Sequence, residues 1–293
     1  MTRSYLELIQ KVLKQPKSPN RTDIEARSLF GQSLRFDLRN GVLPVITTKP
    51  IPIKMIAKEL FFFMRGETNQ KLLEENGVGI WKGNSSRDYL DSRGLTEYKE
   101  YETLGPIYGF QWRHFGAKYI DCHTDYTGQG IDQLMNAINT IKTDPTNRRI
   151  LISAWNPQDL DKMALPPCHV LIQFYVSHDG YLSGHLFQRS ADLMLGVPFN
   201  ITSYALLIHI MAKICGLKAG EFLHSMTDVH IYENHVDGAW EQLKRTPCDF
   251  PKVEIDIDLS LSPEEIVKNL HCDQIKIFNH VFDSRPIKLK MAV

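Results

Sequence analysis

In the stretch Leu165-Pro166-Pro167-Cys168-His169, a cysteine stands directly before two apolar runs that decide the fold around it. The runs are Val170-Leu171-Ile172-Gln173-Phe174-Tyr175-Val176 and Tyr181-Leu182-Ser183-Gly184-His185-Leu186-Phe187, with Asp179-Gly180 between them. An Asp-Gly pair between two such runs is typical of a hairpin turn, so we expect two antiparallel strands. Cys168 and Arg189 lie at mirrored distances from the turn. A hairpin therefore predicts a thiol beside a guanidinium.

Cys168 is a candidate nucleophile. A cysteine attacks as the thiolate and needs a nearby cation or donor to lower its pKa from the free value of about 8.5. Arg189 and Ser190 are candidates for that environment. Taken alone, the same residues also fit a small core cysteine and a surface charge at the end of a strand.

Longer motifs decide between these interpretations. Pro167-Cys168-His169, Gln188-Arg189-Ser190 with Asp192, and Leu195-Gly196-Val197-Pro198-Phe199-Asn200-Ile201 occur in this order, and the chain resembles the thymidylate synthases in all three. The resemblance extends from Asn20-Arg21-Thr22 to the C-terminal Met291-Ala292-Val293. It implies an α+β fold with a large mixed, twisted sheet and flanking helices, and a homodimer that packs sheet against sheet.

The hydrophobic pattern favours the same fold class. We expect helices at about 5–13, 53–64, 130–143 and 199–215, the last closed by Gly216, and further strands at 28–38, 149–155 and 222–232. These elements lack the regular alternation of a doubly wound sheet. Without a linker or a repeat, residues 1–293 are expected to form a single domain.

Composition limits the function. The 34 basic and 34 acidic residues cancel, which argues against a protein that mainly holds DNA and favours a small anionic ligand. The five cysteines are odd in number and widely spaced, which suits neither a disulfide framework nor a zinc site. The N-terminus lacks the apolar run of a signal peptide, and His209 and Lys213 interrupt the most apolar helix before the roughly 20 residues of a membrane span. We therefore expect a cytoplasmic protein without a membrane partner.

The resemblance implies reductive methylation of dUMP to dTMP. Cys168 adds to C6 of the uracil ring, and 5,10-methylenetetrahydrofolate is both carbon donor and reductant, leaving as dihydrofolate. The implied catalytic residues are Cys168, Glu59, Tyr108, His169 and Asp192. Glu59 moves protons at the pyrimidine and the folate, with a pKa raised by burial. From the residues alone, Glu59 could equally turn to solvent, and Tyr108 could be a packed aromatic side chain.

The implied substrate contacts surround a phosphate, a sugar and a base. Arginine suits the phosphate because it offers paired donors. Asn200 reads the uracil edge, whereas relatives that hydroxymethylate dCMP carry Asp there, so Asn200 indicates dUMP. The substrate-binding residues are Arg21, Arg148, Arg149, Gln188, Arg189, Ser190, Asn200, His230 and Tyr232, with Arg148 and Arg149 reaching the site of the other subunit.

The folate contacts implied by the resemblance include an indole and the C-terminus. They are Lys49, Trp81, Asn84, Asp192, Leu195, Gly196, Phe199, Ala292 and Val293. No metal is implied, and we find no metal-ligand spacing in the sequence.

The chain departs from the family near Arg21, where Asp23 and Glu25 replace a loop rich in glycine and threonine. Their charges are expected to weaken anion binding there. Two alternatives stay open: a dUMP hydroxymethylase, in which water replaces hydride, and a catalytically silent nucleotide-binding or RNA-binding relative. Trp81 favours methylation because its ring would shield the reacting carbon.

Overall fold

The computed structural model describes residues 2–290, which form two compact units. Unit 1 contains residues 2–53, 174–256 and 275–290, and unit 2 contains Lys54–Gln173 and Ile257–Gln274. A division into compact units does not decide what folds independently, so the single domain stays a prediction.

Helices and strands alternate irregularly along the chain. The helices are α1 (Thr2–Leu13), α2 (Ile53–Met64), α3 (Gln70–Glu75), α4 (Arg87–Ser92), α5 (Tyr108–His114), α6 (Gln133–Thr143), α7 (Gly196–Ile214), α8 (Val236–Leu243) and α9 (Pro263–Lys268). The strands are β1 (Lys17–Ser18), β2 (Ala26–Asp37), β3 (Leu151–Ser153), β4 (His169–Val176), β5 (Tyr181–Asp192), β6 (Lys218–Tyr232), β7 (Lys252–Ile255) and β8 (Ile275–Phe278).

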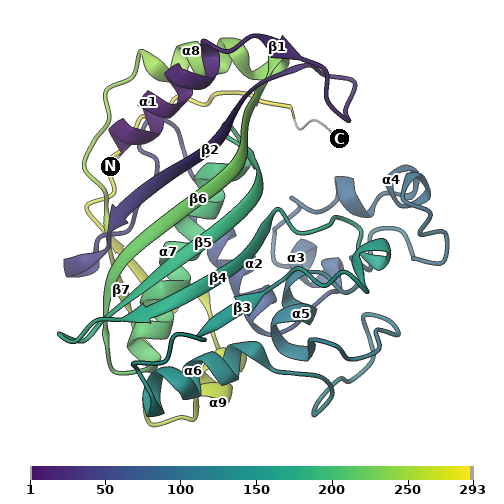
Figure 1. The fold of residues 1–293 in the computed structure, drawn as a ribbon, viewed down its shortest axis with the longest axis vertical. Coiled ribbons are helices and arrows are strands. Elements are labelled where there is room, and N and C mark those ends of the chain that lie inside the picture. The colour runs from purple at the N-terminus through teal and green to yellow at the C-terminus, as the bar shows by residue number, and fades with distance from the viewer. Residues whose placement is uncertain (1, 291–293) are drawn as a thin grey trace. The chain divides into compact units, whose positions relative to one another are not determined.

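Six strands form a mixed sheet in the order β1-β2-β6-β5-β4-β3 (Figure 1). β2 runs antiparallel to β6, β5 runs parallel to β6, and β3 runs antiparallel to β4. A parallel pair needs a crossover, and α7 supplies it between β5 and β6. The mixed sheet with its helices confirms the predicted fold class, and β7 and β8 form a separate antiparallel pair.

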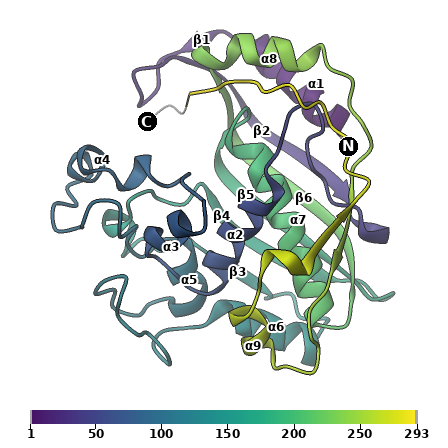
Figure 2. The ribbon, with the colours of Figure 1, turned by 180° about the vertical axis from the view of Figure 1, so that it is seen from behind.

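The core of unit 1 lies between α7 and the sheet. Figure 2 shows α7 across β5 and β6. On β6 the buried side chains alternate, and the ring of Phe222 stacks on Phe36 of β2 with a centroid distance of 5.9 Å. After α7, Gly216 adopts a φ of +69°, a backbone conformation that is unfavourable for residues with a Cβ. The glycine therefore ends the helix where the sequence predicts.

α7 corrects one expectation from the sequence. Among the described residues it is the helix that is long and apolar enough, by length and composition, to cross a membrane. Its 19 residues begin at Gly196, before the predicted start, and 83% of its apolar 18-residue window is buried inside the protein. Such burial is typical of a core helix.

Unit 2 is held together by a buried arginine as well as by apolar side chains. Arg113 on α5 donates to Asp132 at 2.9 Å, to both oxygens of Glu264 at 2.6 and 2.8 Å, and to the carbonyl of Met64 at 2.9 Å. Its side chain is only 8% exposed. One guanidinium thus links α2, α5, α9 and the residue before α6 through hydrogen bonds, those to the two carboxylates being charge-assisted.

Most predicted elements are confirmed, and two of them are clearly shorter than predicted. The helix over 130–143 begins only at Gln133, because the side chain of Asp132 caps it by accepting from the backbone of Met135. The strand over 149–155 is limited to Leu151–Ser153, and at its free edge the Gln133 side chain bonds both the N–H and the C=O of Ser153. A side chain there takes the place of a neighbouring strand.

Candidate active site

Most of the described residues singled out from the sequence fall in two clusters, one in each unit. In unit 2, Tyr108 is the centre of the first cluster. Its hydroxyl accepts a hydrogen bond from the backbone N–H of Cys168 at 2.8 Å. Its ring stacks on His169 with a centroid distance of 4.1 Å and meets the ring of Trp81 edge-on at 6.1 Å. The candidate nucleophile is therefore fixed against a rigid aromatic group.

Two glycines explain why Tyr108 lies where it does. Gly105 has a φ of +72°, and a Cβ on it would lie 2.1 Å from the carbonyl oxygen of Lys162. A Cβ on Gly109 would lie 3.0 Å from the carbonyl oxygen of Phe63, so α5 packs closely on α2. The pattern Gly-Pro-Ile-Tyr-Gly thus encodes a tight entry into α5 that buries Tyr108.

Glu59 is partly buried and hydrogen-bonded, so the alternative that it turns freely to solvent is wrong. Trp81 donates its indole N–H to Glu59 Oε1 at 2.7 Å. Burial raises the pKa of Glu59 to about 7, and the bond from Trp81 opposes this rise. A carboxyl group with this pKa can both give and accept a proton near neutral pH.

The other predicted residues of unit 2 differ in exposure. Asn84 is 8% exposed, on a short 3-10 helix (Gly83–Ser85) that begins two residues after Trp81. Arg148 and Arg149 are exposed, and within residues 2–290 neither guanidinium forms an ion pair. Two such charges remain available to an anion.

The second cluster lies in unit 1, where the carboxyl ends of the parallel strands β5 and β6 meet. In the register of these strands, Ser190 pairs with Asp228 and Asp192 pairs with His230. Arg189 precedes Ser190 on β5, and Tyr232 ends β6 with its ring 5.0 Å from that of His230. Ligand sites commonly form at such an edge.

Asp192 shapes the turn that leads into α7. Its Oδ1 accepts from the backbone N–H of Met194 at 2.9 Å and of Leu195 at 3.1 Å. Lys49 donates to the carbonyl of Met194, and burial lowers the pKa of Lys49 to about 8 although Asp192 opposes this. Gly196, Phe199 and Asn200 follow in the first turns of α7.

Asn200 takes part in a buried row of hydrogen bonds. Gln188, 1% exposed, donates from Nε2 to Asn200 Oδ1 at 3.1 Å and to the carbonyl of Ser190 at 2.9 Å. Gln188 Oε1 lies 2.7 Å from Nε2 of His224, whose side chain is fully buried. His224 was not predicted from the sequence, since a single histidine in a strand has no distinctive spacing.

Arg21 lies in an exposed turn before β2. Asn20 closes this turn by donating to the carbonyl of Ile24 at 2.7 Å and accepting from the backbone of Thr22 at 2.8 Å. Glu25 is paired with Lys17 at 2.6 Å, so part of the expected negative charge beside Arg21 is compensated. Side-chain bonds thus order the loop without the family's glycines.

The predicted contacts Ala292 and Val293 lie outside the described residues. Shortly before them, the carbonyl of Lys290 lies 2.6 Å from Nε2 of the buried His235, whose Nδ1 is 3.9 Å from Asp192 Oδ1. The chain up to Lys290 is therefore anchored beside the turn at Asp192.

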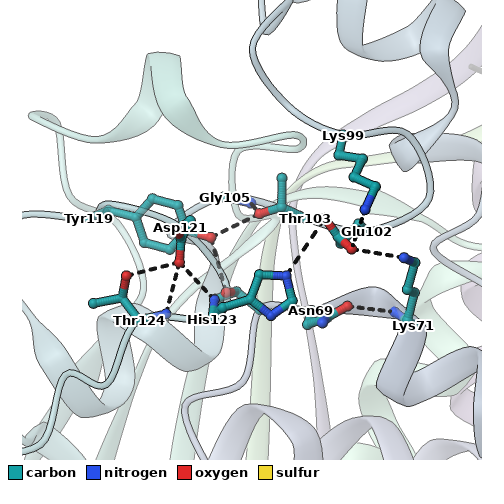
Figure 3. Close-up of polar contacts among 11 residues, drawn as sticks. Asn69, Lys71, Lys99, Glu102, Thr103, Gly105, Tyr119, Asp121, His123 and Thr124 are labelled. Carbon is teal, nitrogen blue, oxygen red and sulfur yellow. Dashed lines mark hydrogen bonds and ion pairs between the residues drawn. The ribbon is translucent and has the colours of Figure 1, made fainter.

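A further polar group in unit 2 was not predicted. Glu102, Cys122 and His123 bring possible metal-ligand atoms within 4.8 Å of one another. However, Glu102 Oε1 accepts from Lys71 at 2.8 Å and from Lys99 at 3.2 Å, while His123 Nε2 lies 3.7 Å from Oε2 (Figure 3). Burial and the Glu102 charge raise the pKa of Cys122. Two ammonium groups and a protonated thiol disfavour a cation, so we assign this cluster no metal role.

Comparison with known proteins gives the same family over the chain. The family model described as thymidylate synthase matches residues 3–293. A probable thymidylate synthase of Schizosaccharomyces pombe is 52% identical over 257 residues, which cover 85% of this chain and 41% of that protein. The bifunctional dihydrofolate reductase-thymidylate synthase of Leishmania major is 47% identical over 293 residues, 99% of this chain and 55% of that protein.

A similar match is bifunctional dihydrofolate reductase-thymidylate synthase 2 of Arabidopsis thaliana, 51% identical over 291 residues, or 99% of this chain and 50% of that protein. The chain thus spans about half the length of the relatives it matches. It belongs to the thymidylate synthase family.

Proposed function

We propose that this chain methylates dUMP at C5 to form dTMP, with 5,10-methylenetetrahydrofolate as co-substrate and dihydrofolate as second product. The observation that carries the proposal is the cluster around Tyr108, which holds the backbone of Cys168 and the ring of His169 while Trp81 holds Glu59. A nucleophile and a carboxyl group with a pKa near 7 are thereby set in one aromatic environment.

Cys168 is the proposed nucleophile. Its thiolate adds to C6 of the uracil ring, and the electrons of the C5=C6 bond move toward C5 and O4, which makes C5 nucleophilic. Cys168 is half-buried, so part of the residue's surface remains exposed. When the product forms, the bond between sulfur and C6 breaks and the thiolate is regenerated.

Proton transfer falls to Glu59 and Tyr108. Glu59 holds or releases a proton toward the pyrimidine O4, which its raised pKa permits at neutral pH. Tyr108 assists removal of the C5 proton, and His169 supports its ring by stacking.

The residues of unit 1 would bind dUMP. Arg189, Ser190 and Arg21 hold the phosphate, His230 and Tyr232 hold the 3′-hydroxyl, and Asn200 with Gln188 reads the base. Support comes from the β5 and β6 register, which brings the ends of both strands to one edge.

The folate fits the polar groups near Asp192. Bound methylenetetrahydrofolate supplies both the carbon and the hydride. Both turn bonds use Asp192 Oδ1, so Oδ2 can accept N–H groups of a pterin. Trp81, Asn84, Leu195, Gly196 and Phe199 would contact the rings, Lys49 would lie toward the anionic tail, and Ala292 and Val293 would complete the site.

A homodimer is part of the proposal. On the strands of unit 1, Phe30 is 83%, Tyr175 65% and Phe187 40% exposed, an apolar surface that favours a partner. In the dimer, Arg148 and Arg149 of one subunit would add positive charge to the phosphate site of the other.

The test is to incubate the purified protein with C5-tritiated dUMP and methylenetetrahydrofolate, and to follow tritium release and dihydrofolate absorbance in one sample. Equal amounts of both support thymidylate synthesis. Tritium release without dihydrofolate would instead indicate hydroxymethylation. The absence of both signals would indicate a silent binding protein. The names of the relatives favour the first outcome.

Cys168→Ser should abolish both signals, with a loss of at least about a thousandfold. Cys248→Ser is the matched control, because Cys248 is also half-buried, and its backbone N–H and C=O bond the hydroxyl of Thr47, which the substitution leaves in place. This variant should keep the wild-type rate.

A further inference from the structure

The row His224, Gln188 and Asn200 connects a fully buried side chain of β6 to the residue proposed to read the base. His224 pairs with Leu186 in the register of β5 and β6. Because Gln188 is two residues after Leu186, its side chain and that of His224 lie on the same face of the strand pair. Its ring stacks on Phe222, with a centroid distance of 5.5 Å and an angle of 22° between the planes. The ring plane of His224 is therefore fixed by packing.

A backbone carbonyl determines the direction of every hydrogen bond in this row. The carbonyl of Ser190 can only accept, and it lies 2.9 Å from the amide of Gln188, so that amide must present Nε2 there. Gln188 Oε1 then faces His224, which must carry its proton on Nε2. The second proton of Gln188 Nε2 points to Asn200, which must present Oδ1.

His224 is held in the neutral form that this arrangement needs. Within the described part of the chain its Nδ1 has no hydrogen-bond partner, so a second proton there would be buried without an acceptor. Burial, with a smaller contribution from His185, lowers the pKa of His224 to about 3.

The direction of the row fixes what Asn200 offers a ligand. Its Oδ1 keeps one lone pair and its Nδ2 keeps both protons, which matches the N3–H and O4 of uracil. Cytosine has an acceptor at N3 and a donor at N4, so it would require the reversed amide. Reversal would place Asn200 Nδ2 against Gln188 Nε2, two donors at 3.1 Å.

We propose that His224 is a positioning residue that, together with the Ser190 carbonyl, fixes the amides of Gln188 and Asn200 and thereby selects uracil over cytosine nucleotides. The inference rests on the proposed function only in taking Asn200 as the residue that reads the base. His224 itself need not touch the nucleotide.

The test compares His224→Phe, which keeps an aromatic ring but removes the donor, with His224→Gln, which can still donate from Nε2. Binding of dUMP and dCMP is measured by calorimetry, and kcat/KM is measured for both. We expect His224→Phe to lose at least about tenfold in the preference for dUMP, as when a buried polar group loses its partner. His224→Gln should retain most of that preference.

The matched control is His209→Gln, because His209 is also buried but its Nε2 contacts the carbonyl of Val42. Its dUMP preference should equal that of the wild type. An unchanged preference in folded His224→Phe would overturn the inference, as would equal losses in His224→Phe and His224→Gln.

Two further readouts separate this inference from the proposed function. If the wild type binds dUMP without turnover, the proposed function fails but the binding preference still tests His224; if it binds neither nucleotide, both fail. In wild-type protein with 15N-labelled histidine, His224 should appear as the neutral tautomer with its proton on Nε2. A proton on Nδ1 would overturn the inference even if His224→Phe does not fold.

Discussion

Removing the indole N–H of Trp81 tests the electrostatics of Glu59. In Trp81→Phe the carboxylate loses a donor at 2.7 Å, although the aromatic ring remains. A hydrogen bond to a charged group contributes about 1.5–3 kcal/mol, and one pKa unit corresponds to about 1.4 kcal/mol. The pKa of Glu59, about 7 in the wild type, should therefore rise by about 1–2 units.

The assay is carbon NMR of the carboxyl groups in protein with labelled glutamate, titrated between pH 5 and 10. Glu59→Gln assigns the signal by deleting it. Trp240→Phe is the control, because Trp240 is 51% exposed on α8 and its loss should leave the titration of Glu59 unchanged. A pKa of Glu59 in Trp81→Phe at or below the wild-type value would refute the reasoning.

The same shift has a consequence for stability. Glu59 titrates near 4.5 when unfolded and near 7 when folded, so between these values the folded state binds more protons. The free energy of unfolding should therefore fall as the pH rises through this window, by up to about 3 kcal/mol. Subtracting the pH dependence of Glu59→Gln isolates this contribution, and in Trp81→Phe the window should extend to higher pH.

Three further changes test other parts of the structure. Arg113→Met should destabilise the protein by about 2–4 kcal/mol in urea unfolding, because a buried guanidinium that bonds several acceptors is lost. The control Lys276→Met removes the exposed ion pair with Asp256 and should destabilise the protein by less than about 1 kcal/mol. Gly105→Ala should lower the free energy of unfolding by more than about 2 kcal/mol, and it should lower activity by displacing Tyr108. The control is Gly116→Ala, which should lower the free energy of unfolding by about 1 kcal/mol, because Gly116 has a φ of +82° but nothing within 4 Å of an added Cβ. Equal losses would argue against the contact with Lys162. Burial depresses the pKa of His224, so the contribution of His224 to stability is present above about pH 6.5 and is lost as the pH falls toward 3. Acid unfolding of His224→Gln should therefore depend less steeply on pH than that of the wild type. Identical unfolding profiles would contradict this.

Local sequence patterns predicted helices and strands well where the residues within the element determine its structure. The apolar run from Ile53 to Met64 is a helix with the predicted bounds, and the residues Ser177–Tyr181 close the turn between β4 and β5 as the Asp-Gly pair predicts. Contacts between residues distant in the sequence were not predicted. The Gln133 side chain bonds both backbone groups of Ser153 at the free edge of β3, a contact that no period in the sequence records.

The candidate site shows the same division. Family motifs predicted Cys168, Tyr108 and Glu59 as site residues, and the structure adds the hydrogen bonds that hold them. The bond between Trp81 and Glu59 and the contact of His224 with Gln188 join residues far apart in the chain, so neither could be read from spacing. Cytoplasmic localisation, the homodimer and the absence of DNA and membrane partners stay predictions.

The most direct test of the central claim is the mass of the protein after incubation with 5-fluoro-dUMP and methylenetetrahydrofolate. Fluorine at C5 cannot leave as a cation, so a covalent adduct formed by thiolate addition at C6 should persist instead of turning over. We predict an adduct that contains the nucleotide and the folate on the peptide carrying Cys168, and none in Cys168→Ser. An adduct on Cys122, Cys215, Cys248 or Cys272, or its persistence in Cys168→Ser, would contradict the account.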